Sequence, residues 1–111
     1  MDEITDLFEK IDGLLTEPVA GEHEPALLRI ENTLTEGYAR ALALEAERWR
    51  LERRIGEVAA MLAHGDRERK TDELQALAER ISSADGDLSL LRGRLSTLRR
   101  RAHEVRTELA S

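Results

Sequence analysis

Two long segments of the sequence repeat apolar side chains at alternating steps of three and four residues. In the first segment, nine of eleven such positions are apolar, and the eleven are Leu27, Ile30, Leu34, Gly37, Ala41, Leu44, Arg48, Leu51, Ile55, Val58 and Leu62. In the second, all eleven are apolar, namely Leu74, Leu77, Ile81, Ala84, Leu88, Leu91, Leu95, Leu98, Ala102, Val105 and Leu109. This spacing keeps one stripe of a helix against a partner helix, and so predicts a coiled coil.

The connection between the two segments is short. Gly65 suits the C-terminal end of a helix, and Asp66 or Thr71 can cap the start of the next one. Two helices of similar length joined in this way become antiparallel neighbours. We therefore predict an all-α fold, a long antiparallel two-helix coiled-coil hairpin with a short N-terminal helix.

The short N-terminal helix is predicted from a single apolar stripe that includes Ile4, Leu7 and Ile11. Pro18 and Gly21 then indicate a linker. We predict one domain over 1–111, divided into an amphipathic helix at 1–15, a linker at 16–24, the first hairpin helix at 25–63, a turn at 64–68 and the second hairpin helix at 69–110.

Composition limits the classes of function. The 111 residues include 17 basic and 23 acidic side chains, a formal charge of -6, and no cysteine. Thiolate chemistry is therefore excluded, and the net negative charge argues against general nucleic-acid binding, which needs a basic face. The acidic N-terminus does not resemble a signal peptide, and no apolar run is long enough to span a membrane. We expect a cytoplasmic protein without a membrane partner.

A second apolar stripe lies outside the seam. Leu28, Leu42 and Trp49 fall on a seven-residue repeat one position beyond it, and Tyr38 lies near that flank. A two-helix seam does not use these side chains, so we predict that they bind a partner. The N-terminal helix or another chain could cover them, and the second case predicts a homodimer in the form of a four-helix bundle.

Arg48 is a charged residue in an apolar seam. One interpretation is that its charge reaches the solvent or sets the register, as polar seam residues do. The other is that it binds an anion or a carboxylate of a partner. Asp85 and Asp87 are expected near its level on the facing helix and could neutralise it.

One polar segment and three glycines within the predicted helices have structural interpretations. The segment 82–87 is the weakest helix-forming stretch and could kink the second helix or act as a hinge. Gly37, Gly56 and Gly93 are interpreted first as positions where helices approach closely. Counting outward from a Leu62–Leu74 pair places Gly37 opposite Leu98.

No catalytic or metal site is predicted. The chain lacks a recognisable Ser/His/Asp set, phosphate loop or paired-carboxylate cleft, so we expect neither an enzyme nor a bound cofactor. His23 and His103 could approach each other at the open end of the hairpin, but neither has a second ligand at helical spacing. The arginines between 92 and 106 are expected to pair with acids that face them across the hairpin.

One stretch resembles a known family. Asp85, Ser89 and Arg92 match the first three positions of an acid, Ser, Arg, Gln, acid pattern found in helical-hairpin anti-sigma proteins that respond to cyclic-di-GMP. Ser96 and Arg100 depart from its last two positions, and Arg100 reverses a charge. The resemblance implies a cyclic-dinucleotide ligand, with Ser89 and Arg92 as anion-binding candidates in addition to Arg48 of the seam.

The sequence thus predicts a non-catalytic interaction or regulatory hairpin that acts by coiled-coil contacts with a protein partner or with itself. The alternative is an anti-sigma-like regulatory hairpin that responds to a cyclic dinucleotide.

Overall fold

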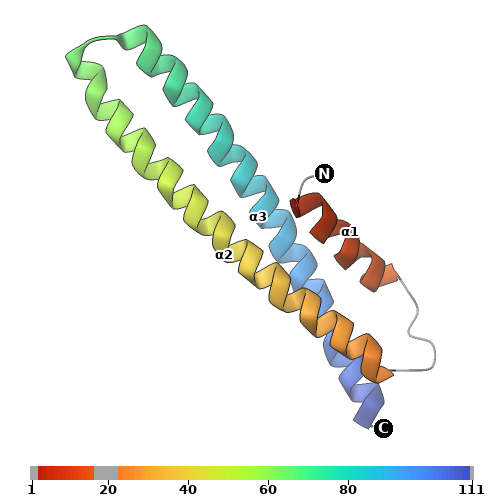
Figure 1. Ribbon diagram of the computed structural model, residues 1–111. Coiled ribbons are helices and arrows are strands. Elements are labelled where there is room, and N and C mark those ends of the chain that lie inside the picture. The colour runs from red at the N-terminus through yellow and green to blue at the C-terminus, as the bar shows by residue number, and fades with distance from the viewer. Residues whose placement is uncertain (1–2, 17–22, 111) are drawn as a thin grey trace. The chain divides into compact units, whose positions relative to one another are not determined.

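Every element of the chain that the structure describes is helical. The computed structural model describes residues 3–16 and 23–110, apart from the side chain of Ala63. In order, the elements are α1 (Glu3–Thr16), α2 (His23–Met61), the short 3-10 helix η1 (Leu62–His64) and α3 (Arg67–Ala110). Figure 1 labels α1, α2 and α3. The all-α hairpin with a short N-terminal helix is therefore confirmed. Residues 17–22 of the predicted linker lie outside the described residues.

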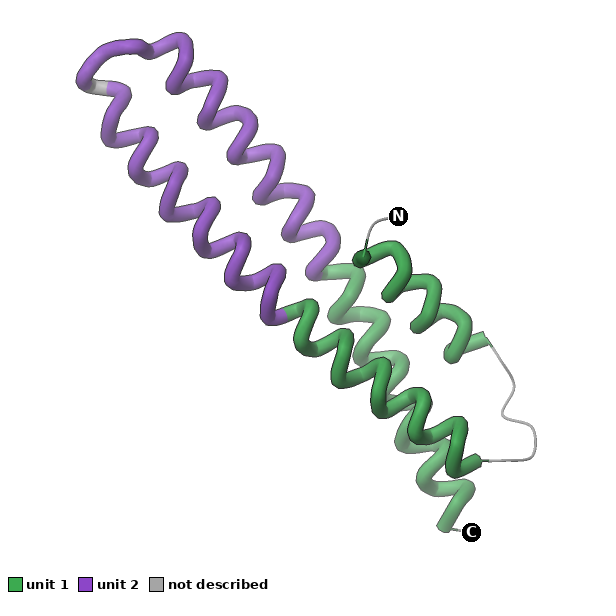
Figure 2. Tube along the Cα trace, viewed as in Figure 1, with its two compact units in different colours: residues 1–41, 89–111 green, residues 42–88 purple. Residues whose placement is uncertain are grey.

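Contacts between backbone segments divide the chain into two compact units, coloured separately in Figure 2. Unit 1 consists of residues 1–41 and 89–111, and unit 2 consists of residues 42–88. Each long helix contributes one segment to each unit, and α2 packs on α3 within both.

Unit 2 is a two-helix hairpin with a thin aliphatic core. Leu51, Val58 and Leu77 are buried in it, and Ile55, Leu74 and Ile81 pack around them. All six are predicted seam positions. Helix α3 continues without interruption through the weak stretch at 82–87, because Ala84 and Leu88 within and after it are buried in the seam, and tertiary packing outweighs low helix propensity.

The turn of the hairpin uses the local chemistry that the sequence predicts. Gly65 follows η1 with φ of 110°, a conformation that residues with a side chain rarely adopt. Asp66 has φ of 57°, and its carbonyl oxygen accepts a 3.1 Å hydrogen bond from the N–H of Lys70. Asp66 thus precedes the first residue of α3, while Thr71 lies inside the helix.

Unit 1 contains three helices. Helix α1 buries the stripe of Ile4, Leu7 and Ile11. Its charged side chains reach both neighbours, and the pairs are Lys10–Glu36 at 3.0 Å, Arg40–Glu3 at 3.5 Å and Arg94–Asp12 at 3.1 Å. Residue numbers rise along α1 as those of its α2 partners fall, so these two helices are antiparallel.

The contact with α1 adds buried positions that the seam does not predict. Ala26 and Thr33 on α2 are 6% and 4% exposed, although neither is a seam position. The Arg94 guanidinium lies 4.6 Å from the centroid of the Phe8 ring, a cation–π contact between α3 and α1. The N-terminal helix therefore belongs to the core of unit 1.

Only one of the three glycines interpreted as close-approach positions has that role. A Cβ atom on Gly37 would overlap the buried side chain of Leu95, whereas a Cβ on Gly56 or Gly93 would meet nothing within 4 Å. The interpretation is right for Gly37 and wrong for the other two. The nearest partner is Leu95 and not Leu98, about one helical turn from the pairing obtained by counting.

Candidate functional site: the outward face of α2 in unit 2

The exposed side chains of Leu42 and Trp49 form the main candidate site. They are 67% and 68% exposed, which is unusual for two large apolar side chains on one helix face. They line an open depression of about 470 Å³ together with Glu45, Ala46, Arg50 and Arg53. All six residues belong to α2 and to unit 2. We call this set the outward face.

The sequence places the outward face away from the seam. Its members follow one another at steps of three, one, three, one and three residues, which traces one stripe along a helix. The seam residues Leu44 and Leu51 are buried against α3. A helix with 3.6 residues per turn puts the stripe nearly opposite them. The face is therefore directed away from α3.

Two cations border the apolar side chains of this face. Arg50 and Arg53 are exposed, and within residues 3–16 and 23–110 neither makes an ion pair. The neighbouring Arg54 is different, because its guanidinium contacts Glu73 at 2.8 Å and Glu57 at 3.4 Å. Hydrogen bonds to Glu73 and then Glu57 raise the pKa of Arg54 above its ordinary value. A surface with apolar side chains and available cations suits a partner with aliphatic and acidic side chains.

The other two predicted partner-binding residues lie in unit 1. Leu28 is 61% exposed and Tyr38 is 42% exposed. Helix α1 does not cover them, because its contacts involve the flank of α2 that carries Thr33 and Arg40. The sequence predicts that either the N-terminal helix or another chain covers these side chains. The N-terminal helix does not cover Leu28 and Tyr38.

Arg48, the charged seam residue, is held by acids. Its Nη1 donates a 2.9 Å hydrogen bond to Asp85, one of the two acids expected near it. Its Nε lies 3.3 Å from Glu52, an ion pair without the geometry of a hydrogen bond. The side chain is about one-third exposed. Two carboxylates already compensate this charge, which weakens its attraction for an added anion.

The remaining anion-binding candidates are on α3 in unit 1. Ser89 and Arg92 are both exposed, and Arg92 has a polar interaction within the chain. Among the neighbouring arginines, Arg106 pairs as expected with an acid across the hairpin, Glu31, at 3.7 Å. Arg94 instead pairs with Asp12 at 3.1 Å, and Arg101 pairs with Glu104 at 3.3 Å. The acids come from α1, α2 and α3 itself.

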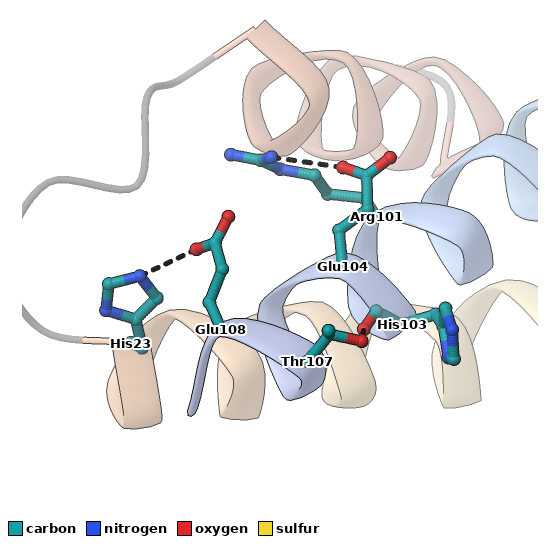
Figure 3. Close-up of polar contacts among 6 residues, drawn as sticks. All are labelled: His23, Arg101, His103, Glu104, Thr107 and Glu108. Carbon is teal, nitrogen blue, oxygen red and sulfur yellow. Dashed lines mark hydrogen bonds and ion pairs between the residues drawn. The ribbon is translucent and has the colours of Figure 1, made fainter. Parts of the chain in front are cut away.

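The two histidines expected at the open end do not converge. Figure 3 shows the His23 ring directed at Glu108, with Nε2 2.7 Å from the carboxylate, while His103 points away. Over the described parts of the chain, no three His, Asp or Glu side chains come together in a way that could hold a metal ion.

A second depression lies in unit 1 between α1 and α2. Its lining is mixed in charge and consists of Glu9, Lys10, Gly13, Leu14, Arg29, Asn32, Thr33 and Glu36. Lys10 and Glu36 already pair across it. Leu14 is the only large apolar side chain in this lining, whereas the outward face has Leu42 and Trp49, so this depression is the weaker candidate for a partner site.

Only part of the outward face is predicted from the sequence. Leu42 and Trp49 were predicted, whereas Glu45, Ala46, Arg50 and Arg53 were not. The signal was present in the sequence, because these four residues fall at helical spacing from Leu42. Charged and small residues at those positions are common on any solvated helix, so the spacing alone did not single them out.

No helix in the described part of the chain is long and apolar enough to cross a membrane. Comparison with protein-family models, with curated proteins and with solved structures gives no match. The residues of the outward face are therefore the features that indicate a function.

Proposed function

We propose that this chain is a non-catalytic interaction protein whose outward face binds a helix of a protein partner. The observation that carries the proposal is the exposure of Leu42 and Trp49 on one face of one helix, about two turns apart. Burying large apolar side chains is the main source of affinity in helix-in-groove recognition, and tryptophan and arginine are enriched among the residues that dominate binding energy.

The chemistry of the partner follows from the border of the face. Arg50 and Arg53 have no acid of their own within the described residues, so a partner with carboxylates beside an aliphatic stripe gains both contacts. The seam on the other side of α2 holds the hairpin together and needs no partner. Binding would therefore add a helix without opening the hairpin. The cytoplasmic location expected from the sequence stays a prediction.

Site-specific photo-cross-linking tests this proposal. A benzophenone amino acid at position 42 is expected to cross-link a protein in the cells that make this chain. The same amino acid at Gln75, an exposed position on α3 of the same unit, is the matched control and should give no such adduct.

The adduct must also depend on the cations. Combining Arg50→Glu and Arg53→Glu should abolish it while circular dichroism stays helical, because both side chains are exposed. An adduct that survives this charge reversal, or the absence of any adduct from position 42, would contradict the proposed function. The mass of the adduct distinguishes a second copy of the chain from a different protein.

A further inference from the structure

We infer that the partner of the outward face is a second copy of this chain, with the two α2 helices parallel and Arg50 of each copy beside Glu45 of the other. This inference rests on the proposed function and names its partner.

The outward face has the spacing of a second coiled-coil seam. Leu42, Ala46, Trp49 and Arg53 follow one another at steps of four, three and four residues, which are the d, a, d and a positions of a heptad. Glu45 and Arg50 then take the flanking g and e positions. In a parallel pair, a g residue lies beside the e residue five positions later on the other helix, and Glu45 and Arg50 are five positions apart. Both copies therefore form the same bridge.

The antiparallel arrangement is less favourable for these charges. In an antiparallel pair, the two-fold axis is perpendicular to both helices, and the g positions of one copy lie beside the g positions of the other. Glu45 would therefore lie on the flank that carries Glu52 of the other copy. Arg50 would lose the acid that the parallel pair provides. Like charges that face each other across an interface disfavour the arrangement that brings them together. Charge therefore selects the parallel pair.

Neighbouring acids do not compete strongly for Arg50. Glu52 pairs with Arg48 at 3.3 Å, and Glu57 pairs with Arg54 at 3.4 Å, each within its own chain. Glu45 also has an interaction within its own chain, so a bridge to a second copy shares this carboxylate.

Side-chain size also fits close pairing. Ala46 is small and lies one turn from Trp49, so the helices can approach and bury the indole rings. Arg53 ends the stripe, where its stem can cover apolar surface while the guanidinium stays in water.

A charge exchange between two variants tests the inference on the full chain. Sedimentation equilibrium should show the wild type exceeding its 12.5 kDa monomer mass as concentration rises. The emission of Trp49, the single tryptophan, should shift to shorter wavelength over the same range. Glu45→Arg and Arg50→Glu should each weaken self-association about tenfold, because each creates two like-charge contacts.

Mixing the two variants in equal amounts should restore association to the wild-type level, since both contacts of the mixed dimer are then attractive. Glu79→Arg, at an exposed position on α3 of the same unit, should associate like the wild type. Circular dichroism of each variant controls for the interaction that Glu45 has within its own chain.

Three results would overturn the inference: a wild-type monomer at all concentrations, single variants that associate normally, or a mixture that fails to recover. A monomer that still gives a charge-dependent adduct of another mass from position 42 would overturn this inference alone. A monomer with no adduct would overturn the proposed function as well.

Discussion

Replacing Gly37 with alanine tests the closest helix contact in unit 1. Two effects oppose each other. Alanine in place of glycine inside a helix stabilises it by about 1 kcal/mol. The new Cβ, however, would overlap Leu95, whose Cγ and Cδ1 would also lie at 3.3 and 3.4 Å. Overpacking of this kind costs about 1–3 kcal/mol.

The environment of Leu95 decides the balance. Its side chain is 2% exposed, so it can turn away only into other packed side chains. We therefore expect Gly37→Ala to be destabilising by about 0–2 kcal/mol. Gly93→Ala is the matched control in the same unit, because its Cβ would meet nothing within 4 Å, and it should stabilise by about 1 kcal/mol.

Denaturant unfolding followed by circular dichroism at 222 nm measures both variants. The difference between the free energies of unfolding of the two variants cancels the gain in helix propensity. It leaves about 1–3 kcal/mol for the overlap with Leu95, which corresponds to roughly 4–12 °C in thermal midpoint. Adding Leu95→Ala should make Gly37→Ala favourable, because the coupling between contacting residues is not additive. If Gly37→Ala stabilises as much as Gly93→Ala, the close-approach reasoning is refuted.

Gly65→Ala should destabilise unit 2 by about 1–3 kcal/mol in denaturant unfolding, because φ of 110° strains any residue with a side chain; an unchanged midpoint would show that the turn relaxes at no cost. Arg48→Leu should be neutral to stabilising by about 1 kcal/mol, because it places an aliphatic side chain in the seam and leaves Asp85, which is half exposed, in water. A marked loss of thermal stability would indicate that the ion pairs of Arg48 stabilise the chain more than an aliphatic seam residue does. Deleting residues 1–20 should leave α2 and α3 helical by circular dichroism while the binding of a hydrophobic dye rises, because the side chains that Ile4, Leu7 and Ile11 cover become exposed; unfolding of the whole chain would show that unit 2 depends on α1.

The sequence by itself determined the hairpin. All seam positions of α2 are buried or half buried, and on α3 only Leu109 is exposed, at 41%. The long helices begin two residues earlier than predicted, and α3 ends at the predicted residue. These features follow from the sequence because the apolar repeat selects one helix face, and because Gly65 permits a turn that other residues resist.

Only the tertiary structure decided where α1 packs and which charges pair. The stripe of Ile4, Leu7 and Ile11 fits many apolar grooves, so its spacing could not identify the flank that carries Ala26 and Thr33. Likewise, Gly37 and Gly93 look alike in the sequence, and only the position of Leu95 distinguishes them. Arg48 and Arg50 differ in the same way, because one has acids within reach and the other has none among the described residues. A helical repeat specifies which face a residue occupies, whereas contacts between helices also depend on their rotation and separation, which the packing of all the side chains sets together.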